Sequence, residues 1–180
     1  CEGESPIVGF GDHPADPHFE PTQEIAYTLK QGDTILLDLW ARRIEPVGIY
    51  YDITWCAFAG SKPPAKYVEI FRVVVEARDA AVAFVSRRLA AGTPVHGYEV
   101  DDACRKIVKD AGYGDYFLHR TGHSIGTTVH GNGANIDNLE TRDERLIVPG
   151  TCFSVEPGIY LAGSMAVRTE VDVYVTTAGR

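Results

Sequence analysis

The residues of this 180-residue chain that could carry chemistry fall into two kinds of segment. One is a glycine-rich segment, residues 119–131, which holds three of the six histidines. The others are strand-like segments that carry carboxylates among apolar residues. The histidines are His119, His123 and His130, and the carboxylates are Asp38, Asp52, Glu156 and Glu170. Imidazole and carboxylate are common ligands of catalytic divalent cations, so the first hypothesis is a metal site.

An ionised carboxylate inside an apolar strand such as residues 36–40 is costly to desolvate unless it gains a partner. For any one of the four acids, an ion pair with Arg42, Arg43 or Arg168 is an equal competitor to a metal ion. For four acids in matched pairs beside histidines, metal binding is the more economical interpretation, because four negative charges outweigh one arginine. A mostly oxygen ligand set with one imidazole favours Mn²⁺, with Co²⁺ and Zn²⁺ as alternatives.

The histidines differ in what their surroundings allow. His119 and His123 have the i, i+4 spacing of a zinc-binding pair on a helix, but Gly122 and Gly126 oppose a regular helix there. We expect these two glycines to give the backbone the freedom that brings His123 close to a metal. His130 is expected on a short strand that leads out of the loop.

The elements that must position these residues are mostly strands. Strands are predicted, from length and residue type, over residues 6–11, 34–40, 49–55, 152–156 and 165–177. Apolar residues at helical spacing predict a long helix from Pro63 to about Ala91 and a shorter one from about Glu99 to Ala111. Side chains two residues apart in a strand share a face, so each strand pair can direct both of its carboxylates into one cleft.

The two pairs of carboxylates belong to an internal repeat. Residues 32–38 match residues 150–156: each segment begins at glycine, has apolar residues at the same offsets and ends at a carboxylate. The second carboxylate follows at the same interval of 14 residues in both halves. This indicates two related halves about a pseudo-two-fold axis. Two predicted helices precede the second pair of strands, and residues 1–33 hold no counterpart. Either the first half is reduced, or the chain is a fragment whose leading helices are missing.

Charge and composition exclude several classes of protein. A hydrophobic content of 44% and a charged content of 23% are typical of a globular domain, and 180 residues suffice for one. A net charge of −8 without a Lys/Arg cluster disfavours nucleic-acid binding. Neither a membrane span nor a signal peptide is expected. The four cysteines lack metal-binding spacing, so we expect free thiols and a cytoplasmic location.

Five motifs together resemble the catalytic domain of the pita-bread metallopeptidases, which include aminopeptidase P, prolidase and, more distantly, methionine aminopeptidase. The motifs are Leu37-Asp38-Leu39, Asp52-Ile53-Thr54, His119–Gly126, Ser154–Tyr160 and Val167–Glu170. The resemblance extends over essentially the whole chain, and the HRTGH form is most similar to the Xaa-Pro peptidases. It implies an α+β pita-bread fold, in which two pseudo-symmetric halves form a curved antiparallel sheet covered by helices. Residues 1–180 would be a single catalytic domain without the usual leading helices and N-terminal domain.

By position, the resemblance also implies two divalent cations and five ligands. These ligands are Asp38, Asp52, His123, Glu156 and Glu170. Asp52 and Glu170 would bridge both ions, Asp38 would chelate one, and His123 with Glu156 would complete the other.

The activity that the resemblance implies is that of a metallo-exopeptidase that cleaves the peptide bond before proline, as an Xaa-Pro aminopeptidase does. Two cations would lower the pKa of a bridging water to give a hydroxide and would polarise the scissile carbonyl. Glu156 would take the proton and pass it to the leaving amine. His130 and His18 are expected to act as catalytic groups that hold the carbonyl and the leaving nitrogen. His119 and Arg168 are expected to bind substrate.

The expected partner is a short proline-containing peptide, and a homodimer is a family expectation. Two alternatives stay open: a prolidase that acts on Xaa-Pro dipeptides, and a pita-bread module that binds peptide without catalysis. The second would be expected to have lost metal ligands, whereas all five are present. The chain departs from the family pattern at Gly131, where an acid is usual, and at Trp40, where a small residue is common. The connection from Glu156 to Glu170 is short, which affects the cleft wall.

Overall fold

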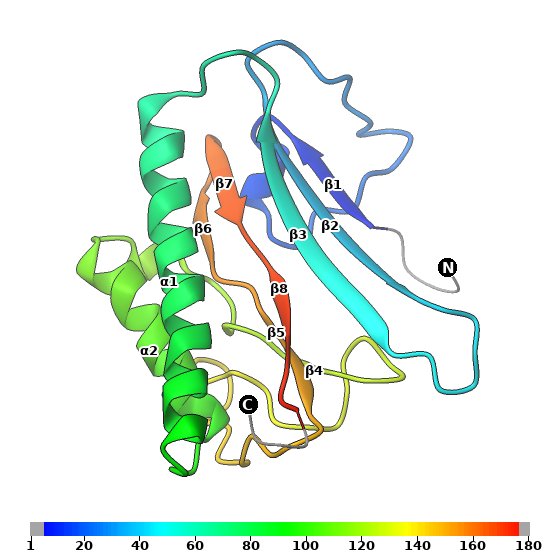
Figure 1. Cartoon of the computed structure of the whole chain (residues 1–180). Coiled ribbons are helices and arrows are strands. Elements are labelled where there is room, and N and C mark those ends of the chain that lie inside the picture. The colour runs from blue at the N-terminus through cyan, green and yellow to red at the C-terminus, as the bar shows by residue number, and fades with distance from the viewer. Residues whose placement is uncertain (1–5, 177–180) are drawn as a thin grey trace.

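The computed structural model describes residues 6–176, which form three antiparallel sheets and two long helices (Figure 1). The strands are β1 (Ile7–Phe10), β2 (Thr34–Arg42), β3 (Tyr50–Phe58), β4 (Ser124–Ile125), β5 (Cys152–Val155), β6 (Gly158–Leu161), β7 (Met165–Arg168) and β8 (Val171–Tyr174). The helices are α1 (Ala65–Ala90) and α2 (Gly97–Asp110), with short 3-10 helices η1 (His13–Ala15) and η2 (Gly114–Tyr116). The predicted α+β class with antiparallel sheets is confirmed.

The first sheet is formed by β1, β2 and β3, in that order. β2 and β3 pair so that Asp38 lies opposite Thr54 and Trp40 lies opposite Asp52. Residues opposite each other in an antiparallel pair project from the same face, so both carboxylates occupy one face of the sheet. That face is turned inward, because Asp38 and Asp52 are both buried. The shared face predicted for this pair is therefore confirmed.

The second half is built differently from the prediction. The single long strand expected over residues 165–177 is wrong: β7 pairs with β6, whereas β8 pairs with β5 after a break at Thr169 and Glu170. The reason lies in the partner strands, which are separated by Pro157, a residue with no backbone N–H to donate to the ladder. At the break, the Glu170 amide turns to the carbonyl of Thr54 on β3, at 3.4 Å. The interruption thus ties β3 of the first half to the second.

The helices pack on the second half. Apolar residues recur along one side of α1, where Tyr67, Ile70, Val74, Ala77, Ala81 and Val85 are buried. They form one core with Val100, Cys104 and Val108 of α2 and with residues of β5, β6 and β7. Helix α2 begins with a capping box, which neither composition nor periodicity predicts. In it, Glu99 accepts a hydrogen bond from the backbone N–H of His96, at 2.9 Å.

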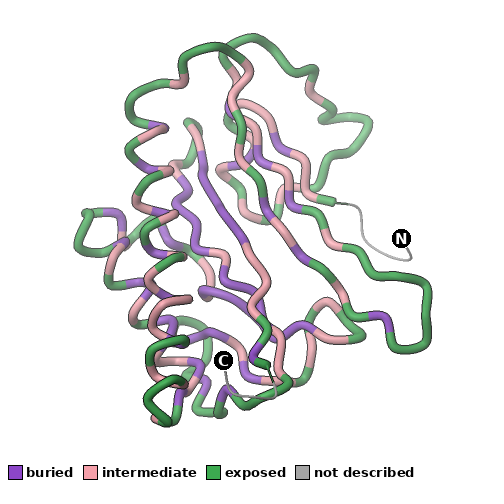
Figure 2. Tube along the Cα trace, viewed as in Figure 1, coloured by how far each residue is buried: buried purple, intermediate pink, exposed green. Residues whose placement is uncertain are grey.

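The two halves differ in what covers them. α1 runs beside β6, β7 and β8, and the β1–β2–β3 sheet lies on the other side of these strands (Figure 1). Buried residues gather along the strands of the second half, whereas the tip of the β2–β3 hairpin is exposed (Figure 2). On the outward face of β2 and β3, Leu39, Tyr51 and Trp55 remain 41%, 55% and 63% exposed. The long helices α1 and α2 instead share their core with strands of the second half.

Two smaller expectations concern the membrane and the cysteines. None of the helices in the described part of the chain is long and apolar enough to cross a membrane. Cys56, Cys104 and Cys152 are free thiols, as predicted, and Cys1 lies outside the described residues.

Candidate metal centre

The five predicted ligands come from five different places in the fold. Asp38 lies on β2 and Asp52 on β3, whereas the other three come from the second half. His123 directly precedes β4, Glu156 directly follows β5, and Glu170 occupies the break between β7 and β8. All five side chains line one cavity of about 330 Å³. The other predicted site residues line the same cavity: His18, His119, His130 and Arg168.

The donor atoms of this group lie close together. The Nε2 atom of His123 is 3.4 Å from Oε1 of Glu156 and 3.6 Å from Oδ2 of Asp52. One donor atom from each of Asp52, His123 and Glu170 lies within 4.8 Å of the others, and all three residues are buried. This spacing allows a single cation to contact all three side chains.

Hydroxyl groups hold the donor atoms in place. The Ser154 hydroxyl donates a hydrogen bond to Oε1 of Glu156 and accepts one from the backbone N–H of His123, both at 3.0 Å. The Thr54 hydroxyl donates to Oε2 of Glu170 at 2.7 Å. Partners of this kind restrict the orientation of metal ligands and raise affinity for the ion.

At Asp38 an arginine, rather than a metal ion, could neutralise the acid. Arg168, which is 3% exposed, donates from Nη2 to Oδ2 of Asp38 at 2.5 Å. It also donates from Nη1 to the hydroxyl of Tyr160 at 2.8 Å and from Nε to the hydroxyl of Thr54 at 3.2 Å. The arginine therefore offsets one of four acids. Oδ1 of Asp38 and Oδ1 of Asp52 stay buried without a hydrogen-bond partner.

The electrostatics of the site show an excess of buried negative charge. Burial, reinforced by Asp38 and Glu156, raises the pKa of Asp52 to about 8. Burial also raises the pKa of Glu156 to about 7, against the opposing charge of Arg168. For Glu170, burial and the neighbouring carboxylates raise the pKa well above its ordinary value. The acids thus favour protonation unless a cation replaces the protons.

His123 is suited to be a neutral ligand. Burial lowers the pKa of His123 to about 4, and the adjacent His130 contributes. The Nδ1 atom of His123 lies 3.2 Å from the carbonyl oxygen of Ser124. When Nδ1–H donates to that carbonyl, the lone pair of Nε2 faces the carboxylates. The donor set, the unpaired carboxylate oxygens and the neutral imidazole therefore fit divalent cations.

Gly122 explains how His123 reaches this position. Its backbone pairs with Ile136 on one side, and a Cβ added at Gly122 would lie 1.9 Å from the carbonyl oxygen of Ser154. Only glycine permits this approach of two backbones. Gly126 differs from the expectation, because it has neither a positive φ nor any atom within 4 Å of an added Cβ.

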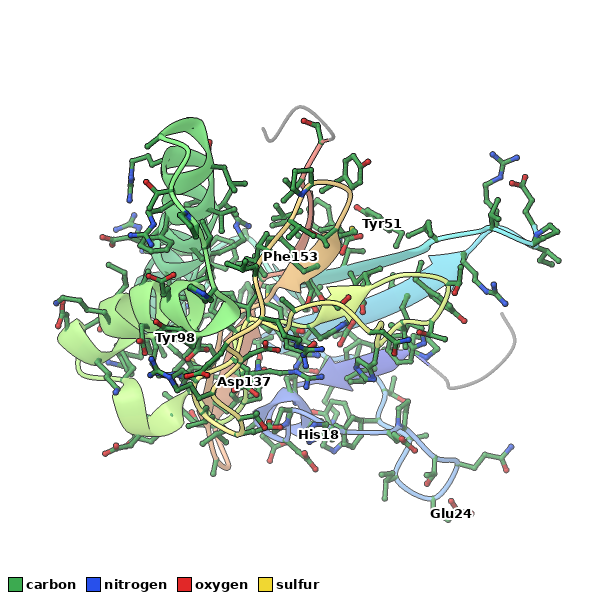
Figure 3. All side chains as sticks on the ribbon, turned by 90° about the horizontal axis from the view of Figure 1, so that it is seen from below. His18, Glu24, Tyr51, Tyr98, Asp137 and Phe153 are labelled. Atoms are coloured by element: carbon green, nitrogen blue, oxygen red, sulfur yellow. The ribbon has the colours of Figure 1, made fainter. Side chains whose placement is uncertain are left out.

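The remaining histidines occupy separate positions around the cavity. His130 is exposed on a bend, so the strand predicted for it is wrong; its ring lies edge-on to that of His123 at 4.4 Å. His119 is half-buried with Nε2 2.6 Å from the hydroxyl of Tyr160, and burial lowers the pKa of His119 to about 3. His18 is exposed beside η1 (Figure 3), and its backbone N–H donates to Asp16 at 3.0 Å.

Sequence reasoning missed several residues that the structure places at the site. Tyr160 is buried between His119 and Arg168, and its place at the end of the Ser154–Tyr160 motif was the available signal. Asp172 accepts a hydrogen bond from the backbone N–H of Asp52 at 3.0 Å. Further residues that line the cavity are Glu20, Trp40, Arg120 and Glu140.

Comparison with known proteins gives consistent matches. Residues 1–177 match the model of metallopeptidase family M24. An uncharacterized peptidase of Staphylococcus saprophyticus is 35% identical over 178 residues, which cover 96% of this chain and 45% of that protein. The chain thus spans less than half the length of the curated relatives that it matches.

Solved structures with the same fold include peptidases of two kinds. A dipeptidase from Pyrococcus horikoshii has a TM-score of 0.81 at 35% identity, over 94% of this chain and 43% of that one. A prolidase from Thermococcus sibiricus has a TM-score of 0.80 at 32% identity, over 94% and 41%. An X-Pro aminopeptidase from Thermotoga maritima has a TM-score of 0.77 at 29% identity, over 93% and 43%.

Proposed function

Since the chain belongs to metallopeptidase family M24, we propose that it hydrolyses the peptide bond before proline in short peptides, using two divalent cations. The observation that carries the proposal is the convergence of five donor residues on one cavity. They are Asp38, Asp52, His123, Glu156 and Glu170. Buried carboxylate oxygens without partners give the cations a clear electrostatic role. The metal that we propose is Mn²⁺, because the donor set is mostly oxygen, with Co²⁺ and Zn²⁺ as alternatives.

When bound, two such cations supply an activated water and polarise the scissile carbonyl. Glu156, oriented by the Ser154 hydroxyl, accepts a proton and delivers it to the leaving nitrogen. His130 and His18 border the cavity and hold the carbonyl and the leaving nitrogen as charge develops. His119, kept neutral by burial, contacts the substrate beside Tyr160.

Arg168 has a more defined task than substrate binding alone. Its donors are committed to Asp38, Tyr160 and Thr54, so in the free protein it orients Asp38 and fixes the cavity wall. Contact with substrate would then come from the part of the guanidinium that borders the cavity.

The length of the substrate separates two forms of this proposal. An Xaa-Pro aminopeptidase releases the first residue of peptides of various lengths, whereas an Xaa-Pro dipeptidase takes only dipeptides. The similar structures named dipeptidase or prolidase favour the second form, and the similar X-Pro aminopeptidase favours the first. A peptide-binding module without catalysis is less well supported, because all five donor residues are retained. Cytoplasmic location and a homodimer stay predictions.

The decisive experiment measures metal content and hydrolysis together. The protein is stripped with a chelator, reloaded with Mn²⁺, Co²⁺ or Zn²⁺, and assayed on peptides with proline in the second position. We expect about two ions per chain and metal-dependent cleavage before proline. Asp52→Asn and Glu170→Gln should each lose both properties. Fewer than about one ion per chain after reloading would refute the proposal.

A further inference from the structure

We infer that Asp172 is a positioning residue: its carboxylate holds the backbone of Asp52 and so fixes one of the proposed metal ligands where the two halves meet. The inference rests on the proposed function, because it assumes that Asp52 binds a cation. Asp172 lies on β8, directly opposite Ser154 of β5, and it is not among the residues that line the cavity. It would therefore act through Asp52 and not by touching the substrate.

The two halves meet along the edge strands β3 and β8. Among the described strands, β3 ends the order β1–β2–β3 and β8 ends the order β4–β5–β8, so each has one edge outside its own ladder. β3 runs beside β7 and β8 (Figure 1), and three pairs of residues are hydrogen-bonded across this seam in one antiparallel register. The pairs of the seam are Cys56 with Arg168, Thr54 with Glu170, and Asp52 with Asp172.

The bond at Asp52 differs from that of a regular ladder. At the neighbouring pair, the backbone N–H of Glu170 donates to the backbone carbonyl of Thr54 at 3.4 Å, as strands normally do. At Asp52, the backbone N–H donates to Oδ2 of Asp172 at 3.0 Å. A side-chain carboxylate thus takes the place of a backbone carbonyl, and it does so at one of the two ligands expected to bridge both cations.

The backbone N–H of Asp52 needs this acceptor because Asp52 is only 4% exposed. A buried N–H without an acceptor destabilises its conformation, and a bond to an ionised oxygen is stronger than one to a neutral carbonyl. Without Asp172, the strand would have to turn this N–H toward water or another acceptor. The Asp52 side chain is attached to the same Cα, so its Oδ2 atom would leave its place 3.6 Å from Nε2 of His123.

Asp172 completes a set of restraints that starts from the same two strands. Ser154, opposite Asp172 in the β5–β8 ladder, binds the carboxylate of Glu156 and the backbone of His123. Asp172 adds the restraint on Asp52, which comes from the other half. Partners that orient metal ligands in this way raise the affinity for the ion. The register of β8 would therefore determine how ligands of both halves face the cations.

The carboxylate of Asp172 has two separable effects on Asp52. It accepts the backbone N–H, and its negative charge acts on the Asp52 carboxylate. Asparagine keeps an oxygen acceptor of the same reach and removes the charge, whereas alanine removes both. If the acceptor is what positions Asp52, asparagine should replace Asp172 and alanine should not.

The test compares Asp172→Ala, Asp172→Asn and a matched control, Asp33→Ala, in the full chain. Asp33 is also half-buried, accepts one backbone N–H, that of Lys30 at 2.7 Å, and does not line the cavity. Each protein is stripped of metal and titrated with Mn²⁺ by calorimetry, and its Co²⁺-loaded form is examined by visible absorption. Urea denaturation of each protein records the stability separately.

In Asp172→Ala, we expect the Mn²⁺ affinity to fall about 10- to 100-fold and the Co²⁺ bands to shift, while Asp172→Asn stays within about threefold of wild type. Asp33→Ala should keep the affinity and spectrum of wild type even where its urea midpoint falls. Unchanged affinity in Asp172→Ala, or an equal loss in the alanine and asparagine variants, would overturn the inference and leave the proposed function intact.

A measurement on the wild type covers the case in which Asp172→Ala does not fold. By NMR, the amide hydrogen of Asp52 should exchange with solvent at least about 100-fold more slowly than in an unstructured chain. Unprotected exchange at Asp52 would refute the hydrogen bond and the inference. If the wild type holds fewer than about one ion per chain after reloading, the proposed function fails and the inference fails with it.

Discussion

At the scale of single residues, the site depends on atoms that have no protein partner. Asp38 uses one carboxylate oxygen to bind Arg168 and leaves the other buried and unpaired. Asp52 likewise has one buried oxygen without a partner. Such groups destabilise a folded protein unless a ligand completes them. The raised pKa values of Asp52 and Glu156 result from burial beside other carboxylates, and divalent cations would neutralise this excess of negative charge.

A first prediction concerns Ser154, whose hydroxyl joins Glu156 to the backbone of His123. Ser154→Ala removes both hydrogen bonds and keeps the volume of the residue nearly constant. We expect metal affinity to fall about 10- to 100-fold, because an unrestrained ligand binds the ion less well. Calorimetric titration with Mn²⁺ measures the effect, and Ser164→Ala on an exposed turn is the control. Equal affinities in the two variants would show that the hydroxyl does not orient the ligands.

At the scale of elements, two irregular features position the donors. The break between β7 and β8 lets Glu170 leave one sheet ladder and reach Thr54 of the other, through both its backbone and its carboxylate. The second feature is the close passage of Gly122 over the carbonyl of Ser154, which brings the histidine segment against β5. A regular strand at either place would direct the ligand away from the cavity.

The passage at Gly122 gives a prediction with a matched control. Gly122→Ala places a methyl group 1.9 Å from a backbone oxygen, so the segments must separate. We expect a loss of about 1–3 kcal/mol or more in the free energy of unfolding, together with weaker metal binding through the displaced His123. Gly126→Ala meets no atom within 4 Å and should change stability by less than about 0.5 kcal/mol. Urea denaturation of both variants provides the measurement, and similar stabilities would contradict the role assigned to Gly122.

At the scale of the whole molecule, the cavity lies between two halves, of which the second carries the long helices. Asp38 and Asp52 come from β2 and β3, and His123, Glu156 and Glu170 come from the half on which α1 and α2 pack. Cations bound by all five residues would therefore stabilise the folded molecule as a whole, by an amount that grows with their concentration.

The pH dependence of this stability follows from the pKa shifts. Asp52 and Glu156 have folded-state pKa values of about 8 and about 7, above the values near 4 expected for an unfolded chain. Their raised pKa values mean that the stability they contribute is complete below about pH 4, falls progressively as pH rises from there, and is lost by about pH 8. His119 and His123 have lowered pKa values, so their contribution increases up to about pH 6.5 and is complete above it.

The metal-free protein should therefore lose thermal stability between about pH 6.5 and about pH 8, where the histidine contribution is complete and the carboxylate contribution still falls. Saturating Mn²⁺ should oppose this loss. The gain in Tm on adding the ion should be larger at about pH 8.5, above the raised carboxyl pKa values, than at about pH 6.5, below them. Scanning calorimetry with and without chelator checks both statements. A metal-free Tm that stays constant or rises over this range would contradict the buried charge excess.

The amino-acid sequence by itself predicted which residues meet in the cavity. Residue type and strand alternation are local properties, so the shared inward face of Asp38 and Asp52 could be inferred before any tertiary contact was known. The internal repeat added the matching pair, Glu156 and Glu170. The helices followed from apolar spacing alone, within a few residues of their observed ends.

Only the tertiary structure decided how those residues are used. The partners of Arg168 depend on segments far apart in the chain, since Arg168 and Asp38 are separated by 130 residues. The division of the predicted 165–177 strand and the bend at His130 likewise depend on neighbouring strands and backbones. Local patterns state which groups are available, whereas burial, charge compensation and hydrogen-bond partners arise from packing between distant segments.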